Sequence, residues 1–258
     1  MWRTIRIAIL TAILAIVAGG AWLDQRRTTS WEHTVRIGAF PVNADGSAAA
    51  AAYIAALDDT QLQSVSDFVA REAHRYGVGI DEPISIRLYP APAVAPPAMT
   101  AGAGMVGRAL WSLRLRRYRS QVVGDIARSR PKIALFLLYH DPALASALPH
   151  SVGLQRGLIG VVQLFAARSQ TPQNAIVIAH ELLHTFGASD KYAPGSNAPL
   201  FPIGYAEPLR EPRFPQRFAE IMAGRVPLSP VRQEMPDDLS QTLVGPATAL
   251  EIGWRLRQ

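Results

Sequence analysis

The stretch HELLHTFGASD, residues 180–190, constrains this 258-residue chain more than any other. His180 and His184 are four residues apart, so on a helix both imidazoles stand on one face and can reach one metal ion. Glu181 projects beside them, where a carboxylate can take a proton from a water molecule held by that ion. Gly187 permits the left-handed backbone that ends a helix, and Asp190 can then turn back as a third ligand.

The residues before this stretch predict the helix that carries it. Residues 175–179 are apolar enough for a buried helix, and Thr171 is expected to cap it, with Pro172 at the first helical position. A helix whose two histidines are merely hydrogen-bonded is the alternative interpretation. The caps, together with a Gly and an Asp at the required offsets, favour the metal site.

The complete pattern, H-E-x-x-H-x-x-G-x-x-D, resembles the zinc-binding signature of the metzincin metallopeptidases. Most metzincins carry a third histidine at the last position, and an aspartate there is similar to the variant in the small secreted snapalysin-type proteases. The resemblance implies Zn²⁺ as the cofactor, with His180, His184 and Asp190 as its ligands. It also implies that Glu181 is the catalytic residue.

Other sources of the third ligand remain open. In thermolysin-like enzymes this ligand is a glutamate on a later helix, and Glu207 and Glu220 both lie downstream. Neither of them sits in a convincing helical run. Another family of H-E-x-x-H proteases takes an aspartate from a Gly-containing loop, which residues 187–192 resemble faintly.

The resemblance implies a role for one further residue, a methionine, and a tyrosine that this sequence lacks at the matching position. Metzincins place a methionine in a tight turn beneath the metal, and Met222, in EIMAG, is the candidate for this Met-turn. A core methionine that only fills space is the alternative. Several metzincins carry a tyrosine two residues later, but Gly224 stands there. Tyr192, Tyr205 and Arg225 are therefore the candidates for supporting the oxyanion.

An apolar run near the N-terminus predicts attachment to a membrane. Residues 7–23 carry no charge, are flanked by basic residues and are just long enough to span a bilayer as a helix. We expect residues 1–27 to be a signal-anchor, or transmembrane helix, of a single-pass protein whose catalytic domain is extracytoplasmic. Cleavage near residues 18–21 would instead make the protein secreted.

The charge of the chain also favours a lipid surface as partner. The net charge is +6 and comes mostly from arginine, which favours anionic partners. No signature of a nucleic-acid-binding module is present, so we expect no nucleic acid partner. Residues 110–123 combine an apolar helical face with four arginines, so this basic helix is a second candidate for membrane contact. An ordinary surface helix with solvated arginines is the alternative.

The hydrophobic pattern predicts an α+β fold in residues 28–258. Its order is similar to that of metzincins, in which a twisted mixed sheet with backing helices ends in the active-site helix. The resemblance thus divides the chain into an N-terminal subdomain, 28–186, and an irregular C-terminal subdomain with a final helix, 187–258. The expected strands are 34–40, 84–88, 132–139 and 158–165, and the other helices are 60–76, 110–123 and 246–255.

The leading functional hypothesis is a zinc-dependent endopeptidase, membrane-anchored or secreted, that cleaves a peptide or protein substrate. In the family resembled, the strand near the cleft is a sheet edge that pairs with the substrate backbone, which would be the role of residues 158–165. The alternative is a non-catalytic zinc-containing, membrane-associated binding protein, which four protein ligands would mark. A third hypothesis is an anionic-lipid-binding protein whose histidine pair is incidental.

Overall fold

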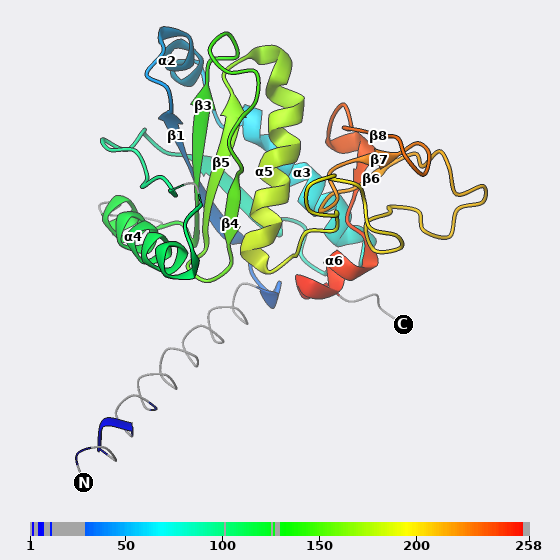
Figure 1. The fold of residues 1–258 in the computed structure, drawn as a ribbon, viewed down its shortest axis with the longest axis horizontal. Helices are drawn as coiled ribbons and strands as arrows, with labels where there is room; N and C mark the ends of the chain where they lie inside the picture. Colours follow the sequence, from blue (N-terminus) through cyan, green and yellow to red (C-terminus); the bar gives the residue numbers. More distant parts are fainter. Residues whose placement is uncertain are drawn as a thin grey trace.

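The computed structural model describes residues 29–100, 102–124, 126 and 130–254, with residues 2, 5–7 and 11 near the N-terminus. Most of the predicted signal-anchor, residues 1–27, lies outside the described residues, so the anchor stays a prediction. Within the described ranges, no helix is both long and apolar enough to cross a bilayer. The described residues form a mixed α+β fold around a five-stranded sheet (Figure 1).

The helices and strands expected from hydrophobic periodicity are all present, together with one further helix, one further strand of the large sheet and four short C-terminal strands. The large sheet contains β1 (Val35–Asn43), β2 (Ile84–Leu88), β3 (Ile133–His140), β4 (Val152–Leu154) and β5 (Ile159–Phe165). The helices are α2 (Ala48–Ala55), α3 (Thr60–Arg75), α4 (Met105–Gly124), α5 (Thr171–Phe186) and α6 (Pro246–Glu251), with short 3-10 turns η1 (Arg168–Gln170) and η2 (Leu239–Gln241). Two small C-terminal sheets pair β6 (Ala219–Glu220) with β9 (Thr242–Leu243), and β7 (Val226–Pro227) with β8 (Gln233–Glu234).

The sheet topology explains why helices cover both of its faces. The strand order is β2-β1-β3-β5-β4, and only β4 is antiparallel to its neighbour. The chain moves one way along the sheet from β1 to β2 and the other way from β2 to β3. Because crossovers between parallel strands are right-handed, α3 and α4 lie on opposite faces. α5 shares the face of α3 (Figure 1).

Alternate residues of each strand divide the core into two layers. On β3 and β5, Leu135 and Val162 belong to the larger layer, which packs against α3 and α5. Phe136 and Val161 belong to the smaller layer, which packs against Leu115 of α4. Burial on both faces accounts for the nearly continuous apolar sequence of β3.

The free edge of the sheet beside α5 is β4, which corrects the role expected for residues 158–165. β5 pairs with β3 on one side and, along residues 159–161, with β4 on the other. It is therefore an inner strand. β4 has only three residues, too few for alternation of side chains to reveal a strand in the sequence.

Two other local expectations need correction. Thr171 is the first residue of α5 rather than its cap, because the η1 turn runs directly into the helix; its hydroxyl bonds to that of Tyr53 instead, at 3.1 Å. Pro172 occupies the first turn of α5 as predicted. α6 ends at Glu251, earlier than expected, and residue 255 lies outside the described residues.

α4 buries only part of its apolar residues against the sheet. Trp111 and Leu115 are buried against the sheet, and the indole Nε1 of Trp111 donates to the carbonyl of Pro97 at 2.7 Å. Its exposed side carries Leu110 and Leu113 together with Arg114 and Arg117, whereas Arg116 and Arg119 are partly buried. Contact between this side and an anionic membrane stays a prediction.

Buried carboxylates hold the loop-rich C-terminal part of the chain against the helices. Oε2 of Glu72, on α3, accepts from the backbone N–H of Val244 at 2.8 Å. The buried carboxylate of Glu220 accepts four hydrogen bonds. Its donors are the backbone N–H groups of Met222, Ala223 and Gly245 and the hydroxyl of Thr248 on α6. Such bonds replace the regular ladders that this region lacks.

We expect Glu220→Ala to lower the free energy of unfolding by about 3–5 kcal/mol, because several buried donors lose their acceptor at once. The measurement is urea denaturation of the full-length chain in detergent. Glu234→Ala is the control, since Glu234 lies in the same region but is exposed and forms a surface ion pair with Arg232; it should change stability by less than about 0.5 kcal/mol. Equal stability of the two variants would contradict the conclusion that the Glu220 carboxylate holds the C-terminal region in place.

Candidate metal centre

The last two turns of α5 bring His180 and His184 together. Their Nε2 atoms are 3.1 Å apart, and their side chains are 14% and 16% exposed. α5 lies between the large sheet and the irregular C-terminal region (Figure 1). The pair therefore sits where these two parts of the fold meet.

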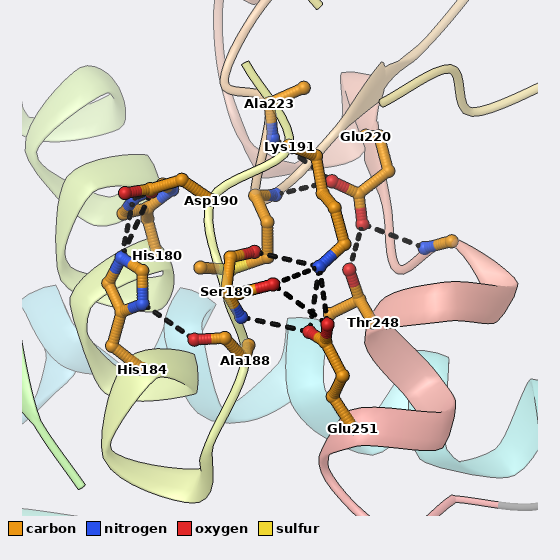
Figure 2. Close-up of polar contacts among 12 residues, drawn as sticks. His180, His184, Ala188, Ser189, Asp190, Lys191, Glu220, Ala223, Thr248 and Glu251 are labelled. Atoms are coloured by element: carbon orange, nitrogen blue, oxygen red, sulfur yellow. Dashed lines mark hydrogen bonds and ion pairs between the residues drawn. The ribbon is translucent and has the colours of Figure 1, made fainter. Parts of the chain in front are cut away.

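The end of α5 directs the chain back toward the histidines. Gly187 has a φ of +110°, and the N–H groups of Gly187 and Ala188 donate to the carbonyls of His184 and Leu183 at 3.0 and 3.1 Å. These are the two bonds of a Schellman motif, which requires a left-handed residue. After this turn, Oδ1 of Asp190 lies 3.2 Å from Nε2 of both histidines, as the spacing predicts (Figure 2).

Two backbone carbonyls fix the orientation of the imidazoles. Nδ1 of His180 lies 3.0 Å from the carbonyl oxygen of Ile221, and Nδ1 of His184 lies 2.7 Å from that of Ala188. Because a carbonyl only accepts, each Nδ1 must carry the proton. In the neutral rings both Nε2 lone pairs then point toward Asp190, as metal-ligating histidines require.

The donor set and its spacing fit a metal ion. The Nε2 atoms and Oδ1 of Asp190 form a triangle with edges of 3.1, 3.2 and 3.2 Å. A tetrahedral ion with bonds of about 2.0–2.1 Å needs ligand atoms about 3.3 Å apart. The ligand atoms of His180, Glu181 and His184 also lie within 4.8 Å of one another. This His-Glu-His group can hold a metal ion.

Glu181 is a buried carboxylate, and one of its oxygens has no hydrogen-bond partner among the described residues. It is 5% exposed, and none of the described residues gives its Oε2 a hydrogen bond. Burial raises the pKa of Glu181, and the charges of His180 and His184 and the amide of Gly153 offset only part of this. A buried, unpartnered carboxylate next to a metal-binding group is typical of a site that handles protons.

The charges of the cluster depend on one another. Burial lowers the pKa of His180, but the carboxylate of Asp190, the charge of Glu181 and the carbonyl of Ile221 together raise it above its usual value. Burial alone would raise the pKa of Asp190, yet hydrogen bonds from Nε2–H of both histidines, in their protonated form, hold it below its usual range. Asp190 is therefore a carboxylate, the form that ligates metal.

The turn that contains Met222 lies directly against this cluster. Its neighbour Ile221 supplies the carbonyl that binds His180, and the carbonyl of Met222 accepts from the backbone N–H of Lys191 at 3.0 Å. Met222 itself is fully buried in the main core. The geometry places the turn where a Met-turn is expected, and the assignment itself stays a prediction.

The two candidate tyrosines are in different surroundings. The ring of Tyr192 stacks 6.4 Å from that of His180, and burial and the nearby Asp190 raise the pKa of Tyr192 to about 12. The ring contacts of Tyr205 are with Phe201 and Phe214 in the 200–215 loop. Only Tyr192 is thus shown beside the histidine pair.

The downstream glutamates considered as third ligands are engaged elsewhere. The carboxylate of Glu220 is occupied by its four donors, as described above. The carboxylate of Glu207 accepts from the side chain and the backbone N–H of Arg217. Neither carboxylate converges on His180 and His184, whereas that of Asp190 does.

Gly153 is a site residue that the sequence does not reveal. On β4, it packs so closely on α5 that a Cβ there would lie 2.4 Å from the carbonyl oxygen of Glu181 and 2.5 Å from Cβ of His184. The sequence around Gly153 does not show why a glycine is needed there, because the need comes from the close approach of α5, a separate element.

A scan against models of known protein families finds no match to this chain, and a search of curated proteins finds no relative. The described residues therefore define the chain as a mixed α+β protein with a His-Glu-His group that can hold a metal ion. The likeness to metzincins rests on the motif.

We expect Gly153→Ala to displace β4 from α5, because both close contacts are with α5 itself. The free energy of unfolding should fall by about 1–3 kcal/mol, and affinity for zinc should fall with it. Denaturation and equilibrium dialysis of the full-length chain measure the two effects. Gly124→Ala, where an added Cβ has no neighbour within 4 Å among the described residues, is the control. If Gly153→Ala has the same free energy of unfolding and the same affinity for zinc as Gly124→Ala, the packing argument is refuted.

Proposed function

We propose that this chain is a zinc-dependent endopeptidase of the metzincin type, with His180, His184 and Asp190 as the zinc ligands and Glu181 as the catalytic base. The observation that carries the proposal is the convergence of the two Nε2 atoms and Oδ1 of Asp190 within 3.1–3.2 Å. The unpartnered carboxylate oxygen of Glu181 and the H-E-x-x-H-x-x-G-x-x-D pattern support it.

The donor set favours zinc and a catalytic site. Two imidazole nitrogens and one carboxylate oxygen suit zinc better than magnesium or calcium, which prefer oxygen ligands alone. Three protein ligands leave one of four positions for water or substrate, which distinguishes a catalytic from a structural zinc site. Zinc bound here would lower the pKa of a water molecule to about 7 and polarise the scissile carbonyl.

Glu181 moves the protons in the proposed reaction. It accepts a proton from the attacking water and passes it to the departing amine when the peptide C–N bond breaks. Because burial raises its pKa, the carboxylate is a stronger base than an exposed glutamate and a better match to neutral pH.

Tyr192 and β4 supply the other contacts in this proposal. The hydroxyl of Tyr192, with its pKa raised to about 12, stays protonated at neutral pH and can donate to the developing oxyanion. β4 is the outer strand of the sheet beside α5, so an extended substrate can add to the sheet there.

The metal test is the zinc content of the full-length chain. We expect one zinc per chain after dialysis. His184→Ala should abolish stoichiometric binding, because it removes one of the converging donors. Zinc at 100 times its dissociation constant should raise the free energy of unfolding of the wild type by about 2.7 kcal/mol. His150→Ala, at an exposed loop position, is the control. Stoichiometric zinc in His184→Ala would overturn the ligand set.

The catalytic test is Glu181→Gln, which keeps the shape of the side chain but removes the base. We expect it to retain zinc and to lower kcat for cleavage of unfolded casein by at least about 10²–10⁴-fold. Glu234→Gln, at an exposed carboxylate, controls for the lost charge. Undiminished cleavage by zinc-loaded Glu181→Gln would disprove the mechanism. A zinc-loaded wild-type chain that cleaves no peptide would favour the non-catalytic binding protein.

A further inference from the structure

A buried lysine directly follows the third proposed ligand. The side chain of Lys191 is only 1% exposed, although lysine is among the residues least often buried. Its ammonium donates to both carboxylate oxygens of Glu251, at 2.8 and 2.7 Å. It also donates to the backbone carbonyl and the hydroxyl of Ser189, at 2.9 and 2.7 Å. The ion pair joins the loop after α5 to α6 (Figure 2).

The carboxylate of Glu251 binds the residue on the other side of Asp190 as well. It accepts from the backbone N–H and from the hydroxyl of Ser189, both at 2.8 Å. Burial raises the pKa of Glu251, but the bonds from Lys191 and Ser189 lower it below its usual value. Glu251 is thus an anion that holds both neighbours of Asp190.

Asp190 itself points away from this ion pair. Figure 2 shows its carboxylate directed toward His180 and His184, while the side chains of Ser189 and Lys191 are directed toward α6. The backbone of Lys191 is fixed too, because its N–H donates to the carbonyl of Met222 at 3.0 Å. The direction of the Asp190 carboxylate is therefore set by bonds that its neighbours make.

We propose that Lys191 and Glu251 form a positioning clamp that presents Asp190 to the metal; this inference rests on the proposed ligand set. Fixing the flanks of a loop ligand before the metal arrives removes the entropy cost of ordering it on binding. Stability alone does not explain the pair, because an ion pair that buries a charge, here the Lys191 ammonium, is often no more stable than apolar residues of similar volume. The clamp residues touch neither metal nor substrate and are positioning residues.

The test is zinc affinity, measured by chelator competition with the full-length chain. Lys191→Met nearly preserves volume and removes the ammonium. We expect it to weaken zinc binding by about 10–100-fold, the usual effect of losing a group that orients a ligand. In an Asp190→Ala background the same substitution should change affinity by less than about 2-fold, because no ligand is left to position.

Two further variants separate positioning from folding. Lys191→Met/Glu251→Leu removes both charges, so no unpaired charge remains buried; it should fold and still bind zinc about 10–100-fold more weakly. Arg217→Met breaks the Glu207–Arg217 ion pair in the same region and should keep wild-type affinity. With Co²⁺ in place of zinc, the visible absorption of the clamp variants should resemble that of Asp190→Ala.

The outcomes distinguish the clamp from the ligand assignment. If Asp190→Ala loses affinity while the folded double variant binds zinc like the wild type, the clamp is wrong and the ligand set stands. If Asp190→Ala itself binds zinc like the wild type, Asp190 is not a ligand and both proposals fall. A loss of affinity in the double variant that disappears in the Asp190→Ala background supports the clamp.

Discussion

The hydrogen bonds from Nδ1 of His180 and His184 to backbone carbonyls are the contacts on which the geometry of the candidate metal site depends. Each bond sets one imidazole tautomer and turns the Nε2 lone pair toward the common point. The carbonyl that binds His184 belongs to Ala188, in the turn that ends the same helix. The carbonyl that binds His180 belongs to Ile221, 41 residues away. The site therefore needs both a local helix end and correct packing of the C-terminal region.

That region is held by carboxyl groups that each accept several hydrogen bonds, rather than by long ladders or disulfides, since the chain has no cysteine. The buried Glu220 accepts hydrogen bonds from two segments of the chain, residues 222–223 and 245–248. The partly exposed Glu251 accepts its hydrogen bonds from Ser189 and Lys191. Both carboxylates bind α6 or belong to it. This short helix thus braces the turn behind His180 and the loop that carries Asp190. Directional bonds of this kind fix irregular backbone more tightly than apolar packing alone.

Periodicity predicted most of the architecture because the sheet is buried on both faces and two of its helices, α3 and α5, are amphipathic. It could not predict β4, whose three residues are defined by their pairing with β5. It also assigned a capping role to Thr171, which is instead the first residue of α5, directly after the η1 turn. The identity of the sheet edge beside α5 depends on strand order, and strand order follows from long-range pairing rather than from local pattern.

The sequence by itself determined that His180, Glu181 and His184 share one turn of a helix and that the chain reverses at Gly187. Both follow from the 3.6-residue period and from the left-handed freedom of glycine, which are local properties. The spacing already made Asp190 the leading candidate for the third ligand, but only the tertiary structure showed that Glu207 and Glu220 are engaged elsewhere and that Glu181 is buried, which raises its pKa. Those outcomes depend on contacts between residues far apart in the chain, such as the pair formed by Lys191 and Glu251, 60 positions apart, and no local pattern encodes them.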